Sequence, residues 1–257
     1  MRLSMDGMER IPRNGIGERL AEIRKRIGEA CRRANRDPRA VTLVAVSKLK
    51  PFSDIMQARR AGANDFGENY VQELTAKLTE AEKNADQESE PIRWHMIGHL
   101  QRNKVRPLMG RTVLIHSVDS PALAEQIEKE SARAGITTDI LLEVNAAGEE
   151  TKWGFRPEEV LRAAEQIQSL SHVRLRGLMT SAPLTEDPET NRPYFRHMKE
   201  LAEELTEKGL ISHDPFAYTL PVLSMGMSGD YEVALEEGAT MIRIGTAVFG
   251  ERHYPKA

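Results

Sequence analysis

A lysine that follows an apolar run is the first candidate for chemistry in this sequence. Residues 41–51 read V-T-L-V-A-V-S-K-L-K-P, so Lys48 stands at the end of a β-branched segment of strand length. An ammonium group there is either solvated at the rim of a sheet or held in a site where it can lose its proton and form an imine. Lys50 could point the same way on an extended chain, but the position of Pro51 favours Lys48 and leaves Lys50 as a rim cation.

Two glycine-containing segments near the end of the chain are candidates for binding a phosphate group. Residues 226–230 read G-M-S-G-D before a predicted helix, and residues 245–247 read G-T-A after a predicted strand. Small residues and free backbone N–H groups at the start of a helix bind anions. Each segment alone could simply turn the chain, but α/β barrels frequently bind phosphate with the loops after strands seven and eight together.

Arg243 is a further candidate, because it interrupts an otherwise apolar strand, M-I-R-I, at residues 241–244. A buried guanidinium without a partner is strongly destabilising. The sequence therefore leaves two possibilities open. Arg243 either points toward a ligand acceptor or forms an ion pair with a carboxylate such as Glu143.

Strands must recur along the chain to position these residues. Apolar runs bounded by turn residues predict eight strands, at residues 41–46, 65–67, 93–97, 113–117, 139–144, 173–178, 220–224 and 241–244. Helical spacing of apolar residues occupies the segments between the strands. It also predicts an amphipathic helix before the first strand, beginning at Ile16.

The connections between these elements carry their own signals. Ser120 and Pro121 predict an N-cap and the first turn of a helix, and a short helix is predicted over residues 101–108. Three glycines each end a helix just before an apolar strand, where the left-handed C′ conformation is needed. They are Gly62, Gly135 and Gly238.

Strict alternation predicts a parallel sheet, and eight repeats predict closure into a single (β/α)₈ TIM barrel with an extra N-terminal helix. An open doubly wound sheet is the alternative, although no G-x-G-x-x-G follows a strand. The barrel is expected over residues 15–257, after a flexible leader at 1–14. In a barrel, strand ends meet at one face, so Lys48, both glycine segments and Arg243 would share one site.

The composition of the 257 residues describes a globular chain, with 40% hydrophobic and 29% charged residues. A net charge of −3 gives no electrostatic reason to expect nucleic acid or an anionic membrane as a partner. Cys31 is the single cysteine, which excludes an intrachain disulfide and favours a reducing compartment. Neither a secretory signal nor a membrane-spanning run is present. We therefore expect a cytoplasmic protein, as a monomer or a weak dimer.

A lysine, two phosphate-binding loops and an arginine in one barrel mouth suit an aldehyde-bearing phosphate held as an imine. Pyridoxal 5′-phosphate (PLP) has this chemistry, because a protein lysine forms its Schiff base while other groups hold its phosphate and ring nitrogen. A sugar-phosphate aldolase with a Schiff-base lysine is the alternative. No metal site is predicted, since His95 and His99 lack the glutamate of H-E-x-x-H.

Six motifs cover nearly everything from Val41 to Arg252. They are A-V-S-K (45–48), F-G-E-N-Y-V-Q-E (66–73), W-H-M-I-G-H-L-Q-R-N-K (94–104), R-G-L-M (176–179), L-S-M-G-M-S (223–228) and R-I-G-T-A-V-F-G (243–250). In order and spacing they closely resemble the YggS/PROSC family of pyridoxal phosphate homeostasis proteins. The resemblance implies a barrel of the alanine racemase N-terminal type (fold type III) that carries PLP without established enzymatic turnover.

The resemblance also implies roles for individual residues. Lys48 would form the Schiff base, and Arg243 would face the pyridine nitrogen. Asn69 would line the cofactor, and no residue receives a catalytic role. The phosphate ligands would be Ser228, Gly245 and Thr246.

The arginine favours a carrier over a racemase. A permanently charged guanidinium can only donate, so it favours an unprotonated pyridine and a weaker electron sink. Racemases of this fold add a tyrosine base from a second domain, whereas only residues 251–257 follow the last motif here. We therefore expect a PLP carrier, with apo PLP-dependent enzymes as possible recipients and a racemase-like enzyme as the alternative. The sequence leaves open the roles of Lys152 and of the charged segment 77–91.

Overall fold

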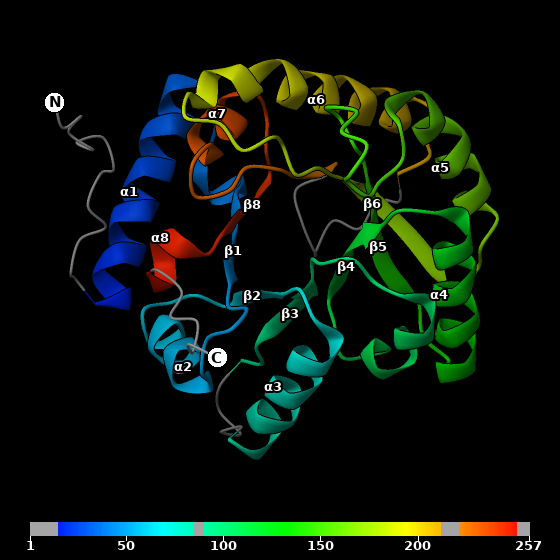
Figure 1. Ribbon diagram of the computed structural model, residues 1–257, viewed down its shortest axis with the longest axis horizontal. Coiled ribbons are helices and arrows are strands. Elements are labelled where there is room, and N and C mark those ends of the chain that lie inside the picture. Colours follow the sequence, from blue (N-terminus) through cyan, green and yellow to red (C-terminus); the bar gives the residue numbers. More distant parts are fainter. Residues whose placement is uncertain (1–14, 85–89, 212–220, 251–257) are drawn as a thin grey trace, which may run out of the picture.

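Eight parallel strands form a closed barrel in sequence order, and the last strand pairs with the first (Figure 1). The computed structural model describes residues 15–84, 90–211 and 221–250. The strands are β1 (Thr42–Val46), β2 (Asp65–Glu68), β3 (Arg93–Met96), β4 (Leu114–Val118), β5 (Thr138–Glu143), β6 (Val173–Met179), β7 (Val222–Ser224) and β8 (Met241–Ile244). The predicted barrel is confirmed. The predicted leader at residues 1–14, and residues 85–89 of the charged segment, lie outside the described residues.

Helices surround the barrel and alternate with the strands along the chain (Figure 1). The α-helices are α1 (Ile16–Arg33), α2 (Phe52–Arg60), α3 (Val71–Lys83), α4 (Pro121–Ala134), α5 (Val160–Gln168), α6 (Arg192–Glu207), α7 (Tyr231–Glu236) and α8 (Thr246–Phe249). Short 3₁₀ helices lie at Pro38–Ala40, Arg102–Lys104, Arg106–Leu108, Pro157–Glu159 and Pro188–Asn191. The three C′ glycines all have positive φ, as predicted: Gly62 (82°), Gly135 (66°) and Gly238 (105°).

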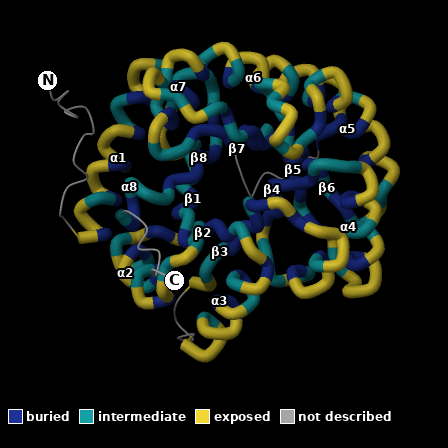
Figure 2. Tube along the Cα trace, viewed as in Figure 1, coloured by how far each residue is buried: buried dark blue, intermediate teal, exposed yellow. Residues whose placement is uncertain are grey.

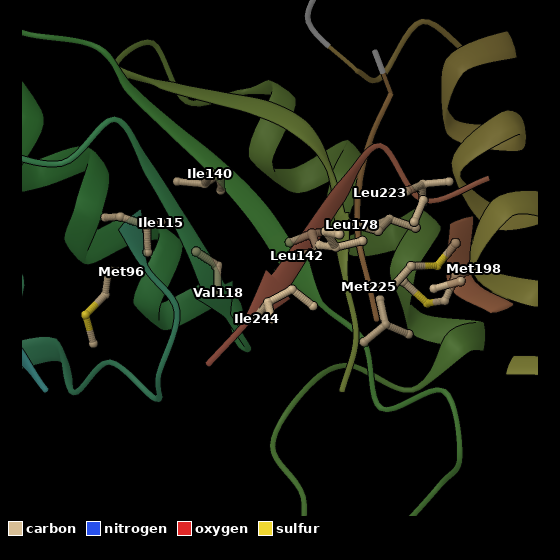
Figure 3. Packing of buried hydrophobic residues seen from close by; sticks show 14 of the residues in the cluster. Met96, Ile115, Val118, Ile140, Leu142, Leu178, Met198, Leu223, Met225 and Ile244 are labelled. Carbon is tan, nitrogen blue, oxygen red and sulfur yellow. The ribbon is translucent and has the colours of Figure 1, made fainter. Parts of the chain in front are cut away.

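Alternating strand residues pack on the two faces of the barrel wall. Ile140 and Leu142 belong to the large core beneath the helices, whereas Leu141 between them belongs to a separate apolar cluster inside the barrel. Figure 3 shows residues of the large core, including Leu142 and Met198 of α6. Figure 2 shows the result, with buried strands at the centre and exposed outer helix faces. The interior cluster comprises Val44, Leu114, Leu141, Met179, Val222 and Met241.

Polar residues form the next layer inside the barrel. His116, Ser224 and Arg243 each follow a residue of the interior apolar cluster by two positions, so they share its face of the wall. Because they are nearer the carboxyl ends of their strands, they lie between the apolar cluster and the barrel mouth. These three residues therefore form a polar layer above the apolar cluster.

The N-terminal helix completes the outer ring. α1 packs against α2, α7 and α8 and buries Leu20 and Ala30. Charged pairs join it to α7: Arg26 lies 2.6 Å from Glu232, and Arg33 lies 2.9 Å from Glu232 and 2.6 Å from Glu236. The extra helix predicted from the sequence is therefore an integral part of the barrel's cover.

A glycine in β6 lies where the neighbouring strand comes very close. Gly177 has a φ of 149°, and a Cβ there would stand 2.0 Å from the backbone oxygen of Val222. The register between β5 and β6 shifts at this point, because Leu141 pairs with Gly177 after Ile140 has paired with Leu175. A larger residue at 177 could not keep the β6–β7 pairing.

Three local predictions need correction. Residues 101–108 form two 3₁₀ helices instead of one α-helix, since Pro107 lacks the N–H that an α-helix would use there. Ser120 is the N-cap residue of α4 and Pro121 begins the helix, as predicted, but the Ser120 hydroxyl donates to Asp119 Oδ1 at 3.0 Å instead of to the backbone of α4. α8 is absent from the predicted elements because four residues are too few to show a helical period.

Among the described residues, no helix is both long and apolar enough to cross a membrane.

Candidate functional site

A cavity of about 380 Å³ opens at the carboxyl ends of the strands. Its walls come from the loops after β1, β2, β3, β6, β7 and β8. The structure brings all six predicted site residues together around this cavity. They are Lys48, Asn69, Ser228, Arg243, Gly245 and Thr246.

The two lysines after β1 point to different places. Leu49 between them has a φ of 60°, and the amide of Lys50 donates to Ser47 O at 3.0 Å, so the chain turns instead of staying extended. Lys48 lines the cavity. The ammonium group of Lys50 donates to the carbonyls of Phe249 and Gly250 at the end of α8, at 3.2 and 3.4 Å. The turn therefore separates two side chains that an extended strand would have aligned.

A buried ionic cluster fixes the backbone of this turn. Lys77 Nζ donates to Glu68 Oε1 at 2.7 Å, to Glu73 Oε1 at 2.6 Å and to the carbonyl of Ser47 at 2.8 Å. The Ser47 hydroxyl donates to Glu68 Oε1 at 2.6 Å, and the Leu49 amide donates to Glu73 Oε1 at 2.6 Å. These contacts hold both residues that flank Lys48.

Sequence reasoning missed this cluster. Burial is the largest influence on Glu68 and raises the pKa of its carboxyl, while Lys77 and Ser47 act in the opposite direction. The i,i+4 spacing of Glu73 and Lys77 is also typical of solvent-exposed helix faces, so it gives no sign of burial. A burial of 94% for Lys77 could not be read from a charged segment.

The two predicted phosphate-binding loops lie next to each other. The Ser228 hydroxyl, in the β7–α7 loop, accepts a hydrogen bond of 3.4 Å from the backbone amide of Ala247 in the first turn of α8. Asp230 holds the first loop closed, because its Oδ1 accepts from the Met227 amide at 2.7 Å and its Oδ2 accepts from Asn191 Nδ2 at 2.9 Å. Ser228 and Thr246 thus line one part of the cavity, beside the start of α8.

Arg243 reaches the cavity and hydrogen-bonds to carbonyl and hydroxyl groups. Its Nη1 donates to the Ser224 carbonyl at 2.6 Å and to the Ser224 hydroxyl at 2.7 Å, and its Nη2 donates to the Thr180 carbonyl at 2.8 Å. No ion pair joins it to Glu143 or to any other carboxylate in the described parts of the chain. Burial lowers the pKa of Arg243 to about 10, so the group stays protonated at neutral pH. The structure therefore does not show the predicted ion pair with Glu143 and places Arg243 in the wall of the cavity.

Two buried oxygen atoms near this site have no hydrogen-bond partner among the residues described. They are Asn69 Oδ1 and Glu143 Oε2. Burial, together with Asp119, raises the pKa of Glu143 to about 7, while Arg243 acts in the opposite direction. Buried acceptors without partners are rare in native proteins and are satisfied by a ligand or by water.

The two histidines of H-M-I-G-H take separate partners. His95 is fully buried and contacts Asp65 and His116, each at 2.9 Å. His99 lies at the barrel mouth, where it bonds Asp119 at 2.9 Å and stacks on Trp153 with 4.0 Å between ring centroids.

Lys152 also lies at the mouth, outside the cavity. Its ammonium group is 2.6 Å from Glu149 and donates to the carbonyls of Ser181 and Ala182 at 3.2 and 3.3 Å. These contacts tie the β5–α5 loop to the end of β6.

The donor set suits PLP. A lysine amine can hold an aldehyde, hydroxyls beside a helix start can hold a phosphate, and a cationic donor can face a ring nitrogen. The cavity is narrow beside Gly245, where a Cβ would stand 3.4 Å from Val46. Asn69 Oδ1 offers an acceptor that no described protein group satisfies.

Sequence comparison finds a matching family and relatives that are described as pyridoxal phosphate homeostasis proteins. Residues 19–253 match the family described as the alanine racemase N-terminal domain. The pyridoxal phosphate homeostasis protein of Aquifex aeolicus is 46% identical over 237 residues, covering 92% of this chain and 98% of the relative. That of Escherichia coli is 37% identical over 246 residues, covering 95% and 99%.

Solved structures show the same fold. PipY of Synechococcus elongatus with PLP bound superposes with a TM-score of 0.76 at 35% identity, covering 91% of this chain and all of that one (100%). Alanine racemase of Corynebacterium glutamicum has a TM-score of 0.67 at 15% identity, covering 92% of this chain and 61% of that one, which shows the barrel fold alone. The chain therefore belongs to the pyridoxal phosphate homeostasis (YggS/PROSC) family, which is built on the barrel of the alanine racemase N-terminal domain.

Proposed function

We propose that this protein binds PLP in the cavity at the barrel mouth, covalently through Lys48 as a Schiff base, and carries it without catalytic turnover. The observation that carries the proposal is the convergence of Lys48, the two phosphate-binding loops and Arg243 on one cavity. When bound, PLP supplies an aldehyde that reacts readily with amines. A carrier keeps that aldehyde from unrelated amines.

Each group in the cavity has a distinct task in this proposal. Lys48 holds the aldehyde carbon from a turn that the Glu68–Lys77 cluster fixes. Ser228 and Thr246, with the start of α8, hold the phosphate. Arg243 donates toward the pyridine nitrogen.

Arg243 also favours carriage over catalysis. A guanidinium has no lone pair to offer as an acceptor, so it cannot keep a pyridine nitrogen protonated. The ring then withdraws electrons weakly, which slows the removal of a proton from a bound amino acid. The geometry thus suits holding PLP more than activating a substrate.

Transfer to a recipient tests the proposal. The protein is loaded with PLP, freed of unbound cofactor by gel filtration and mixed with an apo aminotransferase. We expect a visible absorption band on the loaded protein, and recovery of aminotransferase activity with loss of that band. Lys48→Ala should carry too little PLP to restore activity.

A second measurement separates the carrier from the racemase-like alternative. Amino acids are incubated with the loaded protein in deuterated water, and exchange at Cα is followed by NMR. The carrier predicts rates no greater than those of free PLP. Exchange well above that rate would contradict it and favour a racemase-like enzyme.

A further inference from the structure

A continuous line of hydrogen bonds connects Arg243 with the other end of the barrel interior. Four contacts form it: Arg243 Nη1 to Ser224 Oγ at 2.7 Å, Ser224 Oγ to His116 Nδ1 at 2.9 Å, His116 Nε2 to His95 Nδ1 at 2.9 Å, and His95 Nε2 to Asp65 Oδ1 at 2.9 Å. Ser224, His116 and His95 have no exposed surface. We refer to these five residues as the interior chain.

The interior chain crosses the barrel. Its members come from β8, β7, β4, β3 and β2, and its contact between His116 and Ser224 joins strands that are not neighbours in the sheet. It begins at the cavity and ends at Asp65, the first residue of β2, which also accepts from Arg93 Nε at 3.0 Å. The interior chain therefore links strands across the barrel and not only around its wall.

Only one direction of donation satisfies every group. Arg243 can only donate, so Ser224 Oγ accepts from it and has its own proton left to donate to His116 Nδ1. His116 then carries its proton on Nε2 and donates to His95 Nδ1. His95 likewise carries its proton on Nε2 and donates to the Asp65 carboxylate.

The reverse direction fails at both ends. If His116 donated to Ser224, the hydroxyl proton of Ser224 would have no acceptor among its contacts with Arg243 and His116. His95 would also need protons on both nitrogens to serve Asp65 and His116 together. Burial opposes that charge, since it lowers the pKa of both imidazoles.

We propose that Ser224, His116 and His95 are positioning residues that hold the guanidinium of Arg243 in one orientation toward the cavity, through a chain in which both histidines are neutral Nε2–H tautomers. Each bond polarises the next, and the carboxylate of Asp65 anchors the far end. A neutral His116 also places no second positive charge beside Arg243. The expected effect on PLP binding rests on the proposed function, whereas the assignment of the two histidine tautomers does not.

The tautomers can be measured in the PLP-free protein. In protein labelled with ¹⁵N-histidine, long-range ¹H–¹⁵N NMR spectra distinguish Nε2–H, Nδ1–H and cationic rings. Signals of His95 and His116 are assigned by their loss in single variants. We expect neutral Nε2–H rings for both at neutral pH. A cationic ring or an Nδ1–H tautomer at either position would overturn the proposed chain.

The positioning role is tested by the absorption band and affinity of bound PLP. Ser224→Ala removes a single oxygen atom, and His116→Leu removes the acceptor for Ser224. Each should shift the band and weaken PLP binding roughly 10-fold, as expected for loss of a hydrogen bond to a charged group. His116→Asn keeps an acceptor near the position of Nδ1 and should restore the band.

His172→Leu is the matched control, since His172 bonds Glu128 at the surface, outside the cavity. It should leave both the band and the affinity unchanged. Wild-type bands and affinities in Ser224→Ala and His116→Leu would refute the positioning role. A wild-type protein that binds no PLP would refute the proposed function, while the NMR spectra would still decide the tautomers.

Discussion

Glu143 is an unusual residue for a barrel interior, because its side chain carries an ionisable carboxyl group. It ends β5 two positions after Leu141, so it faces inward, above the apolar cluster. Its Oε2 is buried and has no hydrogen-bond partner among the described residues. Its pKa of about 7 means that the folded protein resists ionisation of this group until neutral pH.

Glu143→Gln should change how stability depends on pH. The pKa of Glu143 is about 7 in the folded state against an ordinary value of 4.5, so folding favours the protonated form. Its contribution is fully present below pH 4.5 and is lost as the pH rises to about 7. Between these limits the PLP-free wild type should lose up to about 3 kcal/mol relative to Glu143→Gln, measured by urea unfolding.

The exposed Glu150 supplies a matched control for this experiment. Glu150→Gln should follow the wild-type stability curve at every pH. Parallel curves for the wild type and Glu143→Gln between pH 4.5 and 7 would show that Glu143 ionises normally in the folded protein.

At the level of elements, the β1–α2 turn depends on groups from β2 and α3. The side chains that act here, Glu68, Glu73 and Lys77, are not among the residues that line the cavity. They act on the backbone on either side of Lys48. The position of the lysine is therefore set by β2 and α3 as well as by its own strand.

Lys77→Met should destabilise the protein strongly. It removes the cation that serves Glu68, Glu73 and the Ser47 carbonyl, and leaves a buried carboxylate unpaired. Breaking a buried ion pair in this way costs about 3–5 kcal/mol. Lys199→Met is the control, because that lysine is half exposed and lies 3.6 Å from Glu203. Its effect should stay below about 1 kcal/mol. Equal free energies of unfolding for the two variants would contradict a structural role for the cluster.

Gly177→Ala should prevent normal folding of the β6–β7 pair. The added Cβ would meet the backbone of Val222, which cannot move without breaking the sheet. The expected loss is more than about 4 kcal/mol, or no soluble protein. Gly28→Ala in α1 meets no atom within 4 Å and should stabilise the protein by up to about 1 kcal/mol. A folded Gly177→Ala variant with a wild-type melting temperature would contradict the close approach seen here.

At the scale of the whole molecule, the barrel face that carries the cavity also carries most of the exposed large apolar side chains. Leu49, Tyr70, Trp153 and Leu184 lie on loops after β1, β2, β5 and β6. The other end of the barrel contributes Val113, before β4. Four of the five exposed large hydrophobic side chains in the described parts of the chain thus surround the mouth, where the candidate cofactor residues also meet.

Much of this architecture followed from the sequence. The barrel was predictable because apolar runs of strand length alternate with helical periodicity eight times, and Gly62, Gly135 and Gly238 mark the connections. The candidate site was predictable because parallel strands bring their carboxyl ends to one face. Lys48, Ser228 and Arg243 could therefore be grouped without knowledge of any distance.

Long-range polar contacts could not be predicted in the same way. The positive φ of Leu49, which separates Lys48 from Lys50, depends on contacts from α3. The partners of Arg243 are two carbonyls and two hydroxyls from β7 and the loop after β6, and no residue pattern in the sequence predicts them. His116 and Ser224 are 108 positions apart, and only the closed barrel brings them together.

Borohydride trapping tests the central claim, that Lys48 holds PLP, most directly. The loaded protein is reduced, digested and analysed by mass spectrometry, with Lys50→Ala as the matched control. We predict that the label lies on Lys48 in the wild type and in Lys50→Ala, and that it disappears from Lys48→Ala. Label on another lysine of the wild type, such as Lys50 or Lys152, would contradict the assignment. An undiminished yield of labelled protein from Lys48→Ala would contradict it as well.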